Sequence, residues 1–192
     1  MRSFSTTLLL CVTAIIRAQQ PSPPKLSTNP LTKDQIAVYR AFLADYNSGS
    51  KSPLNVANIT DPFDSNTDSD EKSGRDSCLR AFPHHISASE VHLLPGEFAS
   101  AKIRLVDPTK HKFADPGDYI HSPQDVDSAV EAGFAHGLMT LSEVVFDTPH
   151  GFAAFSYSFT CGRLCGNGGT VIYQLRRGRW ERSARRCSSW MS

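Results

Sequence analysis

The chain has 192 residues, of which 40% are hydrophobic and 20% charged, and its formal net charge is +1. These values are close to those of globular proteins, so they exclude a chain that cannot build a hydrophobic core, and the length fits one domain with short extensions. The nearly neutral charge gives no global attraction to nucleic acid or to membranes, and we expect no nucleic-acid partner.

Residues 1–18 have the pattern of a secretory signal peptide. Arg2 provides a positive start, residues 4–16 form an apolar run, and Ala18 offers a small residue at a cleavage site. The run is too short to span a membrane, and no other stretch is long enough. A lipid anchor at Cys11 is disfavoured because Leu10 stands where a small residue is needed. We expect an exported protein, periplasmic or secreted, without a transmembrane segment.

The remaining chain divides into a flexible leader at 19–30, rich in Pro and Ser, and a single α+β domain at 31–192. Within the domain, residues 61–76 hold six acids and two bases and few apolar residues, which predicts a mobile acidic loop. Three of its side chains have the first spacings of a calcium loop: Asp64, Asn66 and Asp68. The Gly and the Glu that such a loop needs are replaced by Ser69 and Arg75, so we expect no metal there.

Two amphipathic helices are expected. The first spans 32–47, where Thr32 and Gln35 form a capping-box pattern. The second spans 123–136, after a capping Ser122. Apolar residues recur at helical spacing in both, and they predict one buried stripe on each helix. The expected stripes are Ile36, Tyr39, Phe42, Leu43 and Tyr46 in the first helix, and Val126, Ala129, Val130, Gly133 and Phe134 in the second.

The C-terminal quarter predicts an antiparallel β-meander. In residues 152–161 apolar and hydroxyl side chains alternate, with Ala153, Phe155, Tyr157 and Phe159 on one parity. Arg177 and Gly178 are typical of a two-residue hairpin turn. The expected meander strands are 141–147, 152–161, 169–176 and 179–187; shorter strands are expected at 54–60, 90–94 and 101–106. The fold class is therefore α+β, with two helices covering a meander that can curve into a cone.

Removal of the signal peptide leaves four cysteines: Cys78, Cys161, Cys165 and Cys187. An even number in an exported chain predicts two disulfides. The spacing of Cys161 and Cys165 favours a bond that closes a short loop, which leaves Cys78 to pair with Cys187. A bond between Cys165 and Cys187 is the competing arrangement. A redox or copper-handling dithiol at Cys161 and Cys165, with Arg163 or His150 nearby, is a further alternative.

Arginines crowd the last hairpin, with one glutamate, Glu181, among them. Such a cluster is typical of a solvated edge strand that resists aggregation. It also fits an anionic partner, such as an anionic polymer of the cell surface or an acidic protein surface. The candidate anion-binding residues are Arg163, Arg176, Arg177, Arg179, Arg182, Arg185 and Arg186.

The sequence contains no motif of a known catalytic site, and we assign no catalytic residue, metal or cofactor. Glu143 lies on an expected strand and shares its parity with Asp147, so it could act as a base only if it faced a pocket. The favoured function is a non-enzymatic binding module. The alternatives are a small-molecule-binding or hydrolytic enzyme with a pocket inside the cone, and the redox protein described above.

Residues 141–192, from LSEVVFD through CGRLCGNGG and RGRW to SSWMS, resemble the C-terminal part of a group of exported bacterial proteins. The shared pattern is L-S-x-V-x-F, then C-G-x-L-C-G-x-G, G-x-W and a final W-[IM]-S. The resemblance implies export and a closing β-meander, but no activity, cofactor or catalytic residue. It does not extend to the pairing of Cys78 with Cys187.

Overall fold

The computed structural model describes residues 25–27, 29–50, 52–63, 77–79, 82, 90–113, 126–162, 165–187 and 189–192. Several expectations lie outside these residues: the signal peptide, most of the leader, the acidic loop from residue 64 onward, and Arg163. Among the described helices, none has the length and apolar character that a bilayer crossing requires.

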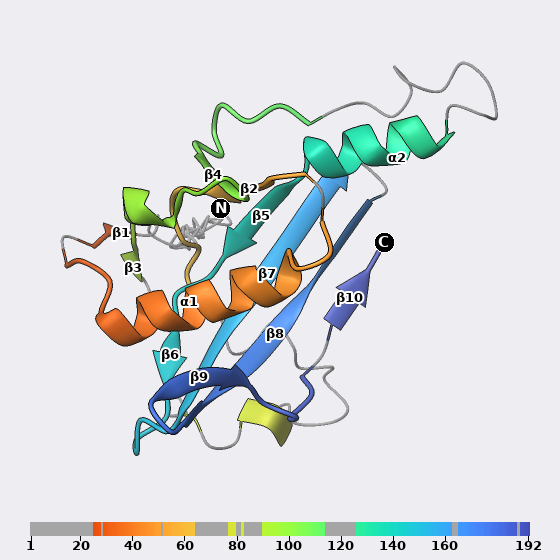
Figure 1. Ribbon diagram of the computed structural model, residues 1–192. Coiled ribbons are helices and arrows are strands. Elements are labelled where there is room, and N and C mark those ends of the chain that lie inside the picture. Colours follow the sequence, from red (N-terminus) through yellow and green to blue (C-terminus); the bar gives the residue numbers. More distant parts are fainter. Residues whose placement is uncertain are drawn as a thin grey trace, which may run out of the picture.

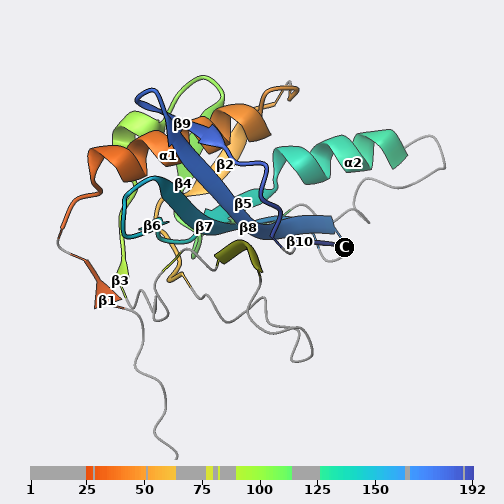
Figure 2. The same ribbon diagram turned by 90° about the horizontal axis from the view of Figure 1, so that it is seen from below.

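The described residues form a strongly curled, mostly antiparallel sheet with both α-helices on one side, as Figures 1 and 2 show. This arrangement confirms the expected α+β class with a curved sheet. The helices are α1 (Lys33–Tyr46) and α2 (Val126–Ala135), with short 3-10 turns at η1 (Ser77–Leu79) and η2 (Gly96–Phe98). The strands are β1 (Lys25–Leu26), β2 (Leu54–Ala57), β3 (Glu90–Val91), β4 (Ile103–Val106), β5 (Leu138–Leu141), β6 (Val145–Phe146), β7 (Phe152–Gly162), β8 (Cys165–Arg176), β9 (Arg179–Arg182) and β10 (Ser189–Met191).

The main sheet has the strand order β10-β8-β7-β5-β2-β4, with β6 also paired to β7 and β9 also paired to β8. The expected antiparallel meander is present, because β6, β7, β8 and β9 pair in sequence. The sheet is larger than the meander, however. β2 lies parallel to both β4 and β5, and these pairs join segments that are far apart in the chain. Strand patterns alone give no information about such long-range partners.

The expected strand at 141–147 was wrong in one respect, because the structure divides it into β5 and β6. Both strands pair with β7, and buried Ser142 occupies the break. The Ser142 hydroxyl accepts a hydrogen bond of 2.8 Å from the Ser156 amide. Asp147 follows the second strand and accepts hydrogen bonds of 2.8 Å from the amides of Gly151 and Phe152. Asp147 therefore holds the turn into β7 through its Oδ1 atom.

The expected last strand at 179–187 was also too long. β9 ends at Arg182, and the chain then leaves the edge of β8 and returns to the same edge as β10. The turn between β8 and β9 follows the prediction, with Arg177 and Gly178 both at positive φ. β8 itself begins at Cys165 rather than at residue 169, because the glycine-rich stretch is part of the strand.

The core lies between α1 and the helix-facing side of β7 and β8. The capping box is confirmed, since the Thr32 hydroxyl accepts from the Gln35 amide and the Gln35 side chain accepts from the Thr32 amide. Phe155 of β7 is completely buried, and its ring centroid lies 5.4 Å from Tyr39 and 5.1 Å from Phe42. The edge-to-face geometry of these pairs is favourable for aromatic rings. Alternation in β7 therefore predicted the correct core-facing side.

The expected buried stripe of α2 was wrong. Only Ala129 and Gly133 are buried, whereas Val130 is 51% and Phe134 is 53% exposed. A Cβ atom at Gly133 would lie 3.2 Å from the Cys161 carbonyl oxygen, so the helix approaches the β7 backbone through its smallest residues. The larger apolar side chains consequently lie on the flanks of the helix, although Phe134 still stacks on Phe159 at 5.8 Å.

A second, smaller core covers the opposite side of the sheet. It consists of Phe63, Cys78, Leu79 and Phe82 packed against Val145, Ala154 and Ile172. Ala154 and Ile172 have the parity opposite to Phe155, and they are buried because this second layer covers them. Figure 2 shows the η1 turn on the side of the sheet away from both helices.

Asp34, in the first turn of α1, joins three elements. One carboxylate oxygen lies 2.9 Å from His150 Nε2 in the β6–β7 turn, and the other accepts a hydrogen bond of 3.2 Å from Trp180 Nε1 of β9. The hydrogen bonds from His150 and Trp180 hold the pKa of Asp34 below its usual value of 3.8. A carboxyl whose pKa is lowered by folding stabilises the folded state above its unfolded pKa, and this contribution is lost as pH falls through the folded pKa.

Replacing Asp34 by asparagine is therefore expected to reduce the free energy of unfolding by about 0–1 kcal/mol at pH 6, a small value because the pair is half exposed to solvent. The difference from the unmodified protein should shrink as pH falls below 3.8. Urea unfolding at several pH values between 6 and 2.5 measures both the loss of stability at pH 6 and its decrease at lower pH. Exposed Glu131→Gln is the control and should show no such pH-dependent difference; a constant Asp34→Asn deficit down to pH 2.5 would contradict the prediction.

Candidate anion-binding site

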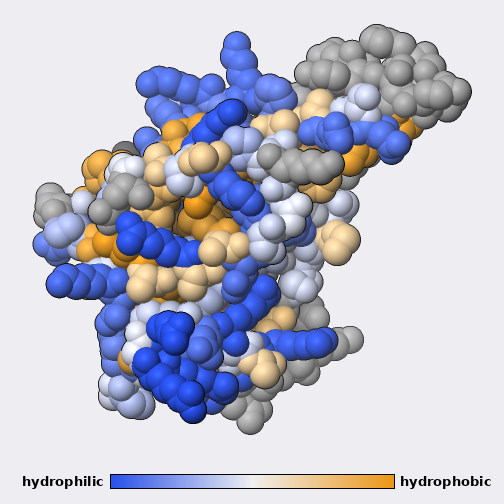
Figure 3. All heavy atoms as spheres, viewed as in Figure 1, coloured by the Kyte–Doolittle hydropathy of each residue, from blue (hydrophilic) through white to orange (hydrophobic). Residues whose placement is uncertain are grey.

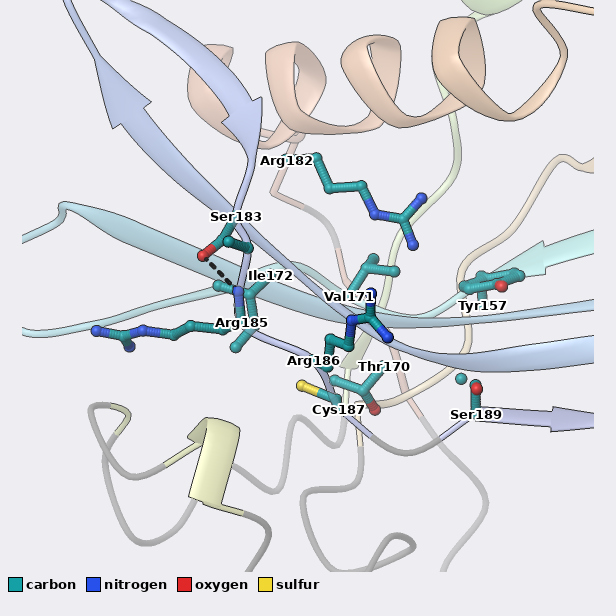
Figure 4. Close-up of a pocket in the computed structure, with 12 residues that line it drawn as sticks. Tyr157, Thr170, Val171, Ile172, Arg182, Ser183, Arg185, Arg186, Cys187 and Ser189 are labelled. Carbon is teal, nitrogen blue, oxygen red and sulfur yellow. Dashed lines mark hydrogen bonds between the residues drawn. The ribbon is translucent and has the colours of Figure 1, made fainter.

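A hollow of about 530 Å³ opens at the edge of β8, where β9 ends. β9 pairs with β8 at residues 173–176 and β10 pairs with it at residues 167–169, so the stretch 170–172 lies between them. Opposite this stretch the chain makes a single backbone hydrogen bond, 2.8 Å from the Ser183 amide to the Ile172 carbonyl oxygen, and then arches outward. The hollow lies between this arch and β8 (Figure 4).

The arch is tied down by a disulfide. Cys187, which lines the hollow, is bonded to Cys78 of the second layer, with a Cα–Cα distance of 5.4 Å. Cys161 and Cys165 are bonded at the tip of the β7–β8 hairpin, with a Cα–Cα distance of 5.1 Å. These two pairs are the ones that the sequence favoured over a bond between Cys165 and Cys187. The first bond restrains the segment that carries Arg185 and Arg186.

The structure divides the predicted arginines into two groups. Arg182, Arg185 and Arg186 line the hollow, whereas Arg176, Arg177 and Arg179 do not line it and lie at the β8–β9 turn. Figure 3 shows the surface over β9 as strongly hydrophilic. Arg176 Nε donates a hydrogen bond of 3.1 Å to Gln174, within the turn region. The arginine-rich sequence is thus not one uniform binding surface.

Within the hollow, two guanidinium groups face the same space. Figure 4 shows the side chains of Arg182 and Arg186 turned into the hollow, whereas Arg185 extends to the far side. Arg185 lies over the Phe152 ring at 4.1 Å, a cation–π contact that holds it there. Neither Arg182 nor Arg186 forms an ion pair with a carboxylate among the described residues.

Neutral groups complete the lining. The hydroxyl-bearing residues Thr170, Ser183 and Ser189 border the hollow, and the Ser183 hydroxyl accepts a hydrogen bond of 3.2 Å from the Arg185 amide. Arg182 also acts electrostatically on buried Tyr173. Burial raises the pKa of Tyr173 well above its usual value, and the positive charge of Arg182 opposes that rise. Two guanidinium forks beside hydroxyl donors are suited to carboxylate, sulfate or phosphate oxygens.

The other residues considered from the sequence do not converge on this hollow. His150 lies at the start of β7 and Cys161 at its end, so the histidine cannot assist a Cys161–Cys165 dithiol. Glu143 lies 3.4 Å from Nε2 of the buried His92, which the sequence analysis did not single out, and neither lines the hollow. Among the described residues, no three His, Cys, Asp or Glu side chains are grouped in a way that could hold a metal ion.

Sequence reasoning missed two contributors to this part of the molecule. The indole ring of Trp190 lies directly over Gly166 and Gly168. A Cβ atom added at either glycine would lie only 2.6–3.3 Å from atoms of that ring. The glycines therefore provide a flat surface for the ring, in addition to any role in a turn. Thr170 belongs to a row of hydroxyl side chains on the same side of the sheet. The alternation of Ser156 and Ser158 in β7 was the one available signal for that row.

The fold and the hollow together define a disulfide-stabilised α+β protein with a candidate anion-binding site at a sheet edge. No known protein family, curated protein or solved structure matches this chain.

Proposed function

We propose that this chain is an exported, non-enzymatic binding module that holds an anionic partner in the hollow between β8 and the 183–187 arch. Arg182 and Arg186 are the binding residues, and the partner is an anionic polymer or an acidic surface. The observation that carries the proposal is that two guanidinium groups without described ion-pair partners enter one hollow. Structural ion pairs usually neutralise arginines held in such a place, and a ligand can take that role here.

Export is part of the same proposal. The two disulfides support it, because such bonds persist mainly outside the reducing cytosol. The signal-peptide pattern at 1–18 points in the same direction. A bond between Cys78 and Cys187 would keep the binding arch in place after export, when the protein is exposed to variable conditions.

The test compares two charge-matched double variants. Arg182→Gln with Arg186→Gln is expected to weaken binding of the oxidised chain to a sulfated dextran by about tenfold or more, because each charge-assisted hydrogen bond contributes about 1.5–3 kcal/mol. Arg176→Gln with Arg177→Gln removes the same charge outside the hollow and should change the affinity less than about threefold. Titration calorimetry at two salt concentrations measures both affinities.

Equal losses in the two double variants would show that binding depends only on overall charge, and the proposed site would then be wrong. Unchanged binding in the Arg182/Arg186 variant would also show that the proposed site is wrong, because the two arginines would then contribute nothing to binding. Circular dichroism of each variant verifies that the sheet is intact, which is expected because all four arginines are exposed.

A further inference from the structure

A second hollow, of about 400 Å³, borders the first one. The two share the lining residues Tyr157, Gly169 and Thr170, so they are next to each other at the edge of β8. The second hollow lies mainly over the side of the sheet that bears the smaller core, and five serine and threonine side chains contribute to its lining. They come from different strands and are placed by strand register: Thr140, Ser142, Ser156, Ser158 and Thr170.

Register arranges these groups in two rows across the sheet. The first row crosses four strands. Ser158 of β7 is paired with Thr140 of β5 on one side and with Gly168 of β8 on the other. Gly168 is paired in turn with Trp190 of β10. In the second row Ser156 is opposite Thr170, and their hydroxyl oxygens are 3.0 Å apart. Side chains at paired positions project to the same face of a sheet, so both rows face one hollow.

The hollow is bounded by a carboxylate and by an indole ring. Asp61 forms a backbone β-bridge with Ser142; burial raises the pKa of its carboxyl group, and the side chain of Thr140 opposes that rise. Trp190 is 48% exposed, although its ring lies over Gly166 and Gly168. One side of the indole therefore rests on the glycines of β8, and the remaining surface is available beside the hydroxyl rows.

The Ser158 hydroxyl lies in the middle of this arrangement. It is half-buried, and the structure gives it no hydrogen-bond partner among the described residues. By contrast, Ser142 and Ser156 are already engaged with neighbouring groups. A half-buried hydroxyl can both donate and accept, so it can be satisfied by a ligand that bears hydroxyl groups of its own.

This lining selects against several ligand classes. A second anionic group would be repelled by Asp61, and a lipid chain would leave the hydroxyl rows without partners. A polyhydroxylated ring fits, since its hydroxyls can pair with the serine, threonine and aspartate oxygens while its C–H face packs on the indole. The neighbouring hollow offers Arg182 and Arg186 to a negative charge.

From this juxtaposition we propose that the partner is an acidic polysaccharide, with a sugar ring in the hydroxyl-lined hollow beside Trp190 and its carboxylate or sulfate group at Arg182 and Arg186. The proposal rests on the anion-binding function proposed above and narrows it to a glycan. Thr140, Ser158 and Trp190 are then specificity residues for the sugar, and the arginines are the anchor for its charge.

The test uses three probes with the full oxidised chain: an oligogalacturonate, a sulfated dextran and an inorganic polyphosphate of matched charge. We expect either acidic glycan to bind at least about tenfold more tightly than polyphosphate. The preferred glycan shows whether the charged group is a carboxylate or a sulfate. Glycan binding should also shift the fluorescence of Trp190, whose indole borders the occupied hollow.

Variants separate this inference from the anion-binding proposal. Trp190→Ala and Ser158→Ala should each weaken glycan binding about fivefold, from the loss of one aromatic or hydrogen-bond contact, and leave polyphosphate binding unchanged. Trp190→Phe keeps a ring and should retain most of the affinity. Met191→Ala, next to Trp190 and 87% exposed, is the matched control for β10 and should have no effect.

Each result has a definite meaning. Equal affinity for glycans and polyphosphate, or insensitivity of glycan binding to both Trp190→Ala and Ser158→Ala, would overturn the glycan inference and leave the anion site intact. Binding of every probe that is unaffected by the Arg182/Arg186 double variant would overturn the anion site itself. Failure of all three probes to bind would overturn both.

Discussion

Removal of the disulfide between Cys78 and Cys187 by alanine substitution of both residues is expected to lower the free energy of unfolding by about 4–5 kcal/mol. The two cysteines are 109 residues apart in sequence, so their bond closes most of the domain into one loop. A long loop restricts the unfolded chain strongly, and loss of that restriction favours unfolding. Urea unfolding followed by circular dichroism under non-reducing conditions measures the change.

The second disulfide is the internal control for this result. Cys161 and Cys165 are only four positions apart in sequence, so their bond removes much less entropy from the unfolded chain. Alanine substitution of that pair should cost about 2 kcal/mol by the same chain-entropy relation. A loss from the Cys161/Cys165 variant equal to or greater than that from the Cys78/Cys187 variant would contradict the expected order. Peptide mapping without reduction checks that each variant retains the other bond.

The Cys78/Cys187 variant also has a functional consequence. This disulfide connects the binding arch to the second layer of the core. Without it, the segment with Arg185 and Arg186 would lose its covalent restraint, and a ligand would have to order it on binding. We therefore expect affinity for acidic ligands to fall together with stability, whereas the Cys161/Cys165 variant should bind normally.

Replacing Phe155 by alanine is expected to reduce the free energy of unfolding by about 3–5 kcal/mol, the usual cost of deleting a buried aromatic ring. Phe155 is completely buried at the centre of the larger core, where its ring meets those of Tyr39, Phe42 and Tyr173. The helix and both long strands converge on this side chain, so neighbouring groups can fill the cavity only partly. Urea unfolding with a linear extrapolation measures the effect.

Phe113→Ala is the matched control, because it deletes the same side chain at a position that is 45% exposed. Its expected cost is below about 1 kcal/mol. A Phe155→Ala variant as stable as this control would mean that Phe155 does not lie at the centre of the core. Phe155 and the three rings that it contacts do not line either hollow, so the folded fraction of Phe155→Ala should still bind acidic ligands.

The two hollows give a physical reason for the unusual composition of the C-terminal segment. Glycines at positions 166 and 168 allow Trp190 to lie over β8 beside the hydroxyl-lined hollow. The departure of the chain after Arg182 opens the arginine-lined hollow at the neighbouring stretch of the same strand edge. The arginines and the terminal tryptophan thus line two neighbouring hollows, and the glycines make room for the tryptophan ring.

Features that depend on local interactions were predictable from the sequence. The capping box at Thr32 and Gln35, the positive-φ turn at Arg177 and Gly178, and the core-facing parity of β7 all follow from neighbours a few residues apart. Hydrogen bonds within a helix end and side-chain alternation along a strand are set by nearby residues. The α+β class could be inferred from these elements because their number and order allow few other arrangements.

Features that depend on distant segments could be recognised only in the tertiary structure. The parallel pairing of β2 with β4 and β5, the exposed flank of α2 and the break at Ser142 arise from how separate elements pack. The candidate site belongs to this group, since strand register and the path of the chain after Arg182 select Arg182 and Arg186 from six similar arginines in the hairpin. The sequence alone determined which chemical groups were present and which short elements they formed. The tertiary structure decided which of those groups share a hollow, because that depends on contacts between residues far apart in the chain.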